Sequence, residues 1–84
     1  IGQFGKALDN VLAVVRAAGG GPEHIATITV YVTDVGAYRQ NLKWVGTIWR
    51  ERMKSHFPAM ALVGIKELVE AEALVEMQAI AYLP

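Results

Sequence analysis

The feature that most constrains the fold is the alternating segment HIATITVYVTD at residues 24–34. In a strand, Ala26, Ile28, Val30 and Val32 would share one apolar face, opposite Ile25, Thr27, Thr29, Tyr31 and Thr33. The apolar face suits packing against helices. The threonine-rich face is too polar for a dry core, yet it carries less charge than an ordinary solvent-facing surface. We therefore expect a sheet with one covered face and one face that meets a cavity or a partner.

Two helical patterns flank this strand. The first runs from about residue 3 to residue 18 and ends at GGGP, with an apolar stripe of Phe4, Leu8, Val11, Leu12 and Val15. The second starts from Asp34 as its cap and reaches Met53, with a stripe of Tyr38, Leu42, Val45, Trp49 and Met53. Gly46 costs this helix roughly 1 kcal/mol relative to alanine, and a close contact between helix and sheet would explain it.

Two further strands are predicted after the second helix. Residues 59–65 are apolar throughout and predict a buried strand, and residues 73–83 alternate as a last strand. The connection KELVEAE at 66–72 is too short for a crossover helix, so these two strands are most simply a hairpin.

The predicted elements form a single α+β domain over residues 1–84. A right-handed crossover places both helices on one face of a mixed sheet. The opposite face is then uncovered by anything in the chain, and it carries Thr27, Thr29, Tyr31, Glu76 and Gln78. This open face predicts an oligomer.

Composition narrows the classes of function. Eight basic and eight acidic residues give no net charge, so neither nucleic acid nor an anionic membrane is an expected partner. No uncharged stretch approaches the roughly 20 residues that span a bilayer, and the cytoplasm is the default location. No cysteine is present, and His24 and His56 lack metal-ligand spacing, so neither a metal nor another cofactor is expected. A hydrophobic content of 54% is high for so short a chain, which again favours subunit contacts.

Glu76 is the residue that most invites a chemical role, because it stands in the middle of an apolar strand. A carboxylate there is costly to bury unless it is paired, hydrogen-bonded or in contact with water. The simpler interpretation is an exposed position on the wet face of an antiparallel sheet. The alternative places Glu76 in a cleft, where it could position or activate a water molecule.

Four segments together resemble the Rid family, also called the YjgF, reactive-intermediate deaminase or endoribonuclease L-PSP family. They are ALDNVLAVVRAAG (7–19), ITVYVTD (28–34), FPAMALVGI (57–65) and LVEMQAIA (74–81). The resemblance implies a fold similar to the bacillus chorismate mutase and a homotrimer that binds small molecules in clefts between neighbouring subunits. It also implies that about a third of the usual domain, the N-terminal strands that precede the first helix, is absent, so that residues 1–84 correspond to its C-terminal two-thirds. The chain begins at Ile1 rather than at a methionine and enters a helical pattern almost at once, so we expect it to be part of a longer polypeptide.

The resemblance also suggests site residues. In the deaminating branch, an arginine after FPA binds the substrate carboxylate, and a glutamate of the final strand assists the water that hydrolyses an imine. Met60 stands at the arginine position, Glu76 matches the glutamate, and Leu62 stands where that branch often has a cysteine. Asn41 is one place out of register with a family asparagine and is not carried over.

The exchange of arginine for Met60 affects the expected substrate. An arginine supplies charged hydrogen bonds worth roughly 1.5 to 3 kcal/mol each, which a thioether cannot replace. The resemblance therefore implies an enamine or imine hydrolase for a substrate without the usual carboxylate contact, with Glu76 on the water and Met60 and Leu62 shaping the pocket. The alternative is a non-catalytic trimeric module that binds or senses a ligand.

Overall fold

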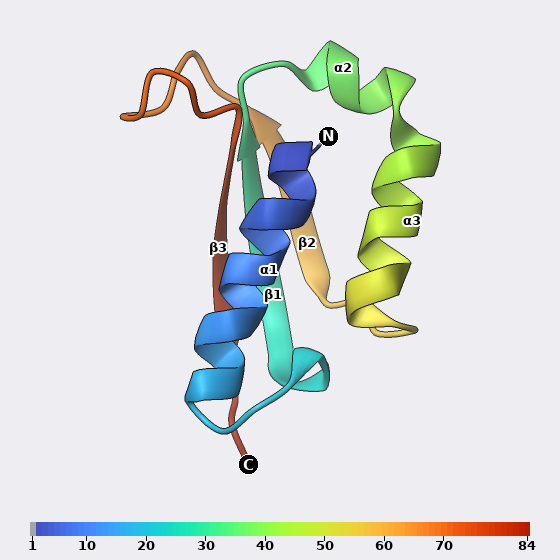
Figure 1. Ribbon diagram of the computed structural model, residues 1–84, viewed down its shortest axis with the longest axis vertical. Coiled ribbons are helices and arrows are strands. Elements are labelled where there is room, and N and C mark those ends of the chain that lie inside the picture. The colour runs from blue at the N-terminus through green and yellow to red at the C-terminus, as the bar shows by residue number, and fades with distance from the viewer. Residues whose placement is uncertain (1) are drawn as a thin grey trace.

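A computed structural model of the chain describes residues 2–84. In it, the alternating segment forms the central strand of the sheet, between two other strands. The elements in chain order are α1 (Gly2–Ala17), a 3-10 turn η1 (Pro22–His24), β1 (Ile25–Val32), α2 (Val35–Gln40), α3 (Leu42–Met53), β2 (Ala59–Gly64) and β3 (Val75–Ala81). Helices α1 and α3 lie side by side on one face of the sheet, and α2 joins the end of β1 to α3 (Figure 1). The predicted α+β class, with both helices on one face of a mixed sheet, is confirmed.

The sheet order is β2-β1-β3, so the predicted hairpin between the last two strands is wrong. Strand β1 pairs in parallel with β2 and antiparallel with β3. The connection between β2 and β3 instead crosses the end of the central strand (Figure 1). Its two ends are tied there, because Ile65 N donates to Val32 O at 2.8 Å and Thr33 N donates to Leu74 O at 3.1 Å.

The hydrophobic core lies between the helices and the sheet. Its buried members are Phe4, Leu8, Leu12, Val15, Ile25, Ile28, Val30, Val32, Tyr38, Trp49 and Met53. Ile25 was expected on the open face but is only 1% exposed. A β-bulge between Ile25 and Thr27 inserts one residue opposite β3 and returns Ile25 to the helix face.

The second predicted helix is broken in two at Asn41. Asp34 caps α2 as expected, since its Oδ1 accepts a hydrogen bond of 3.0 Å from Ala37 N. Asn41 ends α2 with a non-helical backbone and donates from Nδ2 to Ala37 O at 2.7 Å. The contact predicted at Gly46 is also wrong: a Cβ there would approach only the Arg50 guanidinium, at 3.2 Å, and not the sheet.

Helices α1 and α3 are joined by an ion pair. Arg52 of α3 donates from Nε to Asp9 Oδ1 at 2.7 Å and from Nη2 to Oδ2 at 3.3 Å. Gly5 of α1 makes room for this side chain, because a Cβ at Gly5 would lie 3.1 Å from Arg52 Nη2. The hydrogen bond that Arg52 donates to Asp9 raises the pKa of Arg52 above its usual value, so the guanidinium stays charged.

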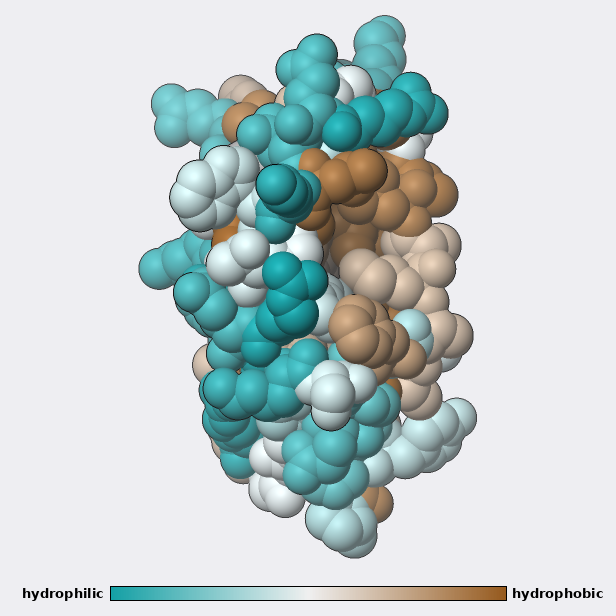
Figure 2. Space-filling view, turned by 90° about the vertical axis from the view of Figure 1, so that its right-hand side faces the viewer, coloured by the Kyte–Doolittle hydropathy of each residue, from teal (hydrophilic) through white to brown (hydrophobic). Residues whose placement is uncertain are grey.

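Strand β2 was predicted to be buried, and all six of its residues are exposed. It forms an edge of the sheet, and α3 lies beside it without covering it. Figure 2 shows hydrophobic side chains gathered along this side of the molecule, behind the polar outer surface of the helices. An apolar edge strand of this kind is a template for contact with another chain. None of the helices in residues 2–84 is long and apolar enough to cross a membrane.

Candidate functional site

Met60 and Leu62 lie on the helix-covered side of the sheet. In the parallel pairing of β1 and β2 they stand opposite Ile28 and Val30, whose side chains are in the core. Their own side chains stay accessible, with exposed fractions of 45% and 37%. Because β2 is the edge strand, these two residues remain available to a ligand or a partner.

Met60 borders a groove of about 230 Å³ between α3 and β2. We call it the inner groove, and it is lined by Phe4, Leu42, Val45, Gly46, Trp49, Arg50, Phe57 and Met60. The rings of Trp49 and Phe57 stack with centroids 6.2 Å apart, and Trp49 Nε1 donates to His56 O at 3.2 Å. Arg50 is the one charged residue in this lining. The inner groove therefore suits an apolar group.

Glu76 lies on the open face of the sheet. It stands opposite Tyr31 in the antiparallel pairing with β1, and Gln78 stands two residues further along β3. Tyr31 donates a hydrogen bond of 3.3 Å from its hydroxyl to Gln78 Oε1. Within residues 2–84, Glu76 makes no side-chain hydrogen bond or ion pair, and it is exposed. The carboxylate of Glu76 is therefore accessible to water or to a ligand.

One chain does not bring the predicted site residues together. Met60 and Leu62 share a face with the core residues of β1, whereas Glu76 shares the opposite face with Tyr31, and β1 separates the two edge strands. Any site that uses both sets of residues takes them from different copies of the chain. The site roles of Glu76, Met60 and Leu62 stay predictions.

Tyr38 was assigned to the apolar stripe of the second helix, and its polar end is the unexpected part of the core. Its hydroxyl is buried without a hydrogen-bond partner in residues 2–84, and its ring meets Phe4 edge-on at 5.8 Å. Burial raises the pKa of Tyr38 from 10.0 to about 12. The helical spacing predicted that the ring of Tyr38 lies in the core. It could not predict that the hydroxyl group would have no hydrogen-bond partner.

The two histidines hold the backbone. His24 Nδ1 accepts a hydrogen bond of 2.9 Å from Gly21 N in the turn before β1. His56 Nε2 lies 2.8 Å from Ile25 O and ties the loop before β2 to the start of β1. Both side chains thus contact the backbone at the start of β1 or in the turn before it.

Comparison with known proteins agrees with this arrangement. The family model Endoribonuclease L-PSP matches residues 2–83. A Rid-family protein of unknown function from Yersinia pestis is 32% identical, with a TM-score of 0.72 over 88% of this chain and 56% of its own. A YjgF-family protein from Mycobacterium tuberculosis is 25% identical, with a TM-score of 0.80 over 95% and 64% of the two chains. Comparison with curated proteins gave no match.

A third solved structure carries a ligand. Escherichia coli TdcF, crystallised with bound serine, is 27% identical and has a TM-score of 0.78 over 93% of this chain and 60% of its own. This chain thus spans less than two thirds of the length of these relatives. The match of the family model over residues 2–83 and the shared arrangement of helices and strands show that the chain belongs to the endoribonuclease L-PSP family, which is the YjgF or Rid family.

Proposed function

We propose that the protein is a hydrolase of small enamines or imines that works at clefts between the subunits of a homotrimer. The observation that carries the proposal is Glu76, an exposed carboxylate without an ion-pair partner in residues 2–84, at the family's glutamate position on the open face. Family membership supports the choice of reaction, because the Rid name denotes reactive-intermediate deaminases. The serine held by E. coli TdcF supports a ligand of small size.

The chemistry assigned to Glu76 is general-base catalysis. The carboxylate accepts a proton from a water molecule while the water oxygen attacks the imine carbon, and the imine nitrogen takes up a proton. Glu76 then returns its proton to the carbinolamine nitrogen, the hydroxyl group loses its proton to solvent, and the carbon–nitrogen bond breaks as ammonia leaves. The products are a carbonyl compound and ammonia, so that one water is consumed for each imine.

The cleft itself requires more than one copy. Glu76 is on the open face and Met60 and Leu62 are on the helix face of the opposite edge strand, so a shared cleft takes Glu76 from one subunit and the two apolar residues from its neighbour. Met60 offers no charge to a carboxylate, and its neighbours Phe57 and Trp49 are aromatic. The substrate class that fits is an enamine or imine with an apolar group, which does not make the usual carboxylate contact at the position of Met60.

The alternative is a trimeric module that binds a ligand without chemistry. It is favoured by the same exposure of Glu76, because no side chain of residues 2–84 holds the carboxylate in a fixed position. Catalytic groups are normally held by neighbouring hydrogen bonds. Assembly or a ligand would have to supply this positioning in the enzyme.

Ammonia release from freshly generated imines separates the two functions. The wild-type protein should release ammonia above background, and Glu76→Gln should lose this activity by about 100-fold or more, the usual contribution of a general base. Glu72→Gln, which removes an exposed carboxylate of the loop before β3, is the matched control and should keep full activity. No release by the wild type favours the binding module, and release that survives Glu76→Gln removes the role of this residue.

Met60→Arg tests the apolar end of the cleft. The substituted arginine should raise activity toward imines that carry a carboxylate and leave uncharged imines unchanged or slower. The same gain with both kinds of substrate would show that Met60 does not contact the substrate. Light scattering at micromolar concentration should give the mass of three chains, and a folded monomer would remove the proposed cleft.

A further inference from the structure

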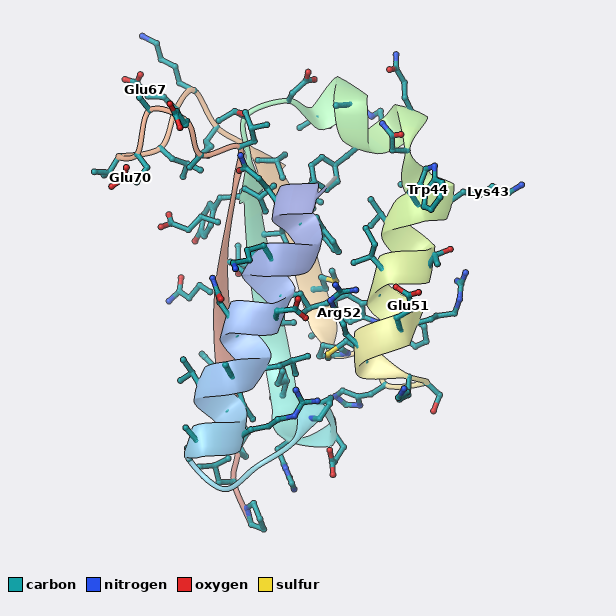
Figure 3. The ribbon with its side chains drawn as sticks, viewed as in Figure 1. Lys43, Trp44, Glu51, Arg52, Glu67 and Glu70 are labelled. Atoms are coloured by element: carbon teal, nitrogen blue, oxygen red, sulfur yellow. The ribbon has the colours of Figure 1, made fainter. Side chains whose placement is uncertain are left out.

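The charges of this neutral chain are separated in space. The connection between β2 and β3, residues 65–74, carries Glu67, Glu70 and Glu72 against a single Lys66, and we call it the acidic loop. The outer surface of α3 carries Lys43 and Arg50. Figure 3 shows Glu67 and Glu70 on one side of the molecule, and Lys43 and Trp44 on the opposite side. The acidic loop and the outer surface of α3 are therefore too far apart to meet within one chain.

The outer surface of α3 contains a groove with exposed apolar side chains. This groove, called the outer groove, has a volume of about 460 Å³ and is lined by Leu42, Lys43, Trp44, Gly46, Thr47 and Arg50. The outer groove shares Leu42, Gly46 and Arg50 with the inner groove, which lies on the other side of these residues. Leu42 and Trp44 are 65% and 63% exposed, which is unusual for large apolar side chains on a helix. Within residues 2–84, neither Lys43 nor Arg50 forms an ion pair. The groove thus combines apolar walls with two unpaired cations.

Gly46 keeps the outer groove open. Its position lacks a side chain in the middle of α3, where glycine costs roughly 1 kcal/mol relative to alanine. Packing within the chain does not explain that cost, because a Cβ at Gly46 would meet only the end of the Arg50 side chain. Access to the groove does explain it.

The acidic loop has the matching properties. Val69 at its tip is fully exposed, at 104%, although it is an apolar residue. The loop is nevertheless held in place, because Gln3 Nε2 donates to Glu72 O at 3.0 Å and Leu74 N donates to Gln3 Oε1 at 2.6 Å. A held loop loses little conformational freedom on binding, which favours association.

We infer that the acidic loop of one copy docks in the outer groove of α3 of a second copy. Val69 enters between Leu42 and Trp44, and the flanking glutamates pair with Lys43 and Arg50. The two contact surfaces lie on opposite sides of the chain, so the contact is head-to-tail and repeats around a ring or along a filament. The inference is independent of the proposed reaction, because it rests on charge placement and exposure alone.

The contact is tested by reversing the charges of the groove, of the loop, or of both together. Reversing the groove (Lys43→Glu with Arg50→Glu) or the loop (Glu67→Lys with Glu70→Lys) should weaken self-association by about tenfold or more, since like charges then face each other. The chain with all four substitutions should regain association to within about threefold of the wild type. Masses are read by sedimentation equilibrium over a range of protein concentration, and circular dichroism confirms that each variant is folded.

Two further variants sharpen the result. Arg16→Glu with Lys54→Glu makes the same change in net charge at exposed positions outside the groove and should leave association unchanged. Val69→Asp should weaken it without lowering stability, because the side chain of Val69 is fully exposed in its own chain. The inference is overturned if the wild type is monomeric, if folded reversed variants keep the wild-type mass, or if the fourfold swap stays dissociated. A trimer that survives both reversals would keep the open-face assembly and remove the loop contact.

Discussion

The two faces of the sheet differ in what covers them. On the helix face, Ile28, Val30 and Val32 are no more than 1% exposed, packed beneath α1 and α3. On the open face, Thr29 and Tyr31 of the same strand stay partly exposed, and Glu76 beside Tyr31 is exposed. Alternate residues of one strand thus have opposite environments. One face therefore supplies the stability of the single chain, while the other keeps residues that its folding does not require.

The largest difference between the two faces is expected for two isoleucines of the sheet. Ile28 of β1 is 1% exposed on the helix face, and Ile80 of β3 is 52% exposed on the open face. Ile28→Ala should lower the free energy of unfolding by about 2 to 5 kcal/mol, because it leaves a cavity in the core. Ile80→Ala should change it by no more than about 0.5 kcal/mol in the dissociated chain. Urea denaturation at low protein concentration measures both.

Equal losses for the two isoleucines would contradict the difference between the faces. A loss for Ile80→Ala that grows with protein concentration would instead show that the open face is buried by assembly. The same pair of variants therefore also reports on the proposed trimer.

Alternation was enough to assign the faces of β1 from sequence, except at Ile25. The period of two assigns residues correctly as long as pairing is regular. The bulge between Ile25 and Thr27 depends on the register with Ala81 and Ile80 of β3, more than fifty residues later, so no local pattern at Ile25 could reveal it. The helix positions were similarly predictable, apart from the break at Asn41, where a side-chain hydrogen bond to Ala37 O ends α2.

The order of the strands could not be predicted from the length of the connection between them. Residues 66–72 are short enough for a hairpin, yet the same length also crosses the end of one intervening strand. Strand β1 lies in the centre, where its apolar residues on the helix face are buried between the neighbouring strands. An apolar strand buries more surface in this position than at an edge. The exposure of β2 was missed because an apolar sequence does not distinguish a strand buried within its own chain from an exposed edge strand.

Only part of the candidate site could be predicted from the sequence. Motif resemblance selected Glu76, Met60 and Leu62, and the open face was predicted with Glu76 on it. Their placement on opposite faces follows from pairing registers, which require the strand order. The outer groove gave no motif at all, because it depends on the space left by Gly46 and on the exposure of Trp44.

A second prediction tests how dry the helix face is. Burial raises the pKa of Tyr38 from 10.0 to about 12 in the folded chain. Because the folded state keeps this proton longer than the unfolded state, the ionisation of Tyr38 leaves the free energy of unfolding unchanged below pH 10. It lowers that free energy as the pH rises from 10.0 through about 12. The expected loss is about 1.4 kcal/mol per pH unit at most within that window.

Tyr38→Phe should remove this part of the alkaline slope, measured by urea denaturation between pH 9 and pH 12. Below pH 10 the variant should be about 1 kcal/mol more stable than the wild type, because it removes a buried hydroxyl without a partner. Tyr31→Phe on the open face keeps Tyr38 and should keep the slope. If the free energy of unfolding of Tyr38→Phe still falls in the same way between pH 10 and pH 12, another group causes the decrease.

The smallest expected effect concerns the ion pair that joins the two helices above the covered face. The side chains of Arg52 and Asp9 are 25% and 53% exposed, so water screens much of their attraction. Asp9→Asn should therefore lower the free energy of unfolding by only about 0.5 kcal/mol, even though the pair has two hydrogen bonds. Denaturation in low salt and in about 1 M salt measures it, and the loss should shrink as screening increases.

Glu51→Gln is the matched control for this pair, because Glu51 lies 3.5 Å from the same guanidinium but belongs to the same helix as Arg52. Its removal leaves α1 and α3 joined and should cost less than Asp9→Asn. A loss of several kcal/mol for Asp9→Asn, insensitive to salt, would mean that the two helices depend on this pair to cover the sheet. In that case the stability of the covered face would come from the helix–helix contact as much as from the apolar residues beneath it.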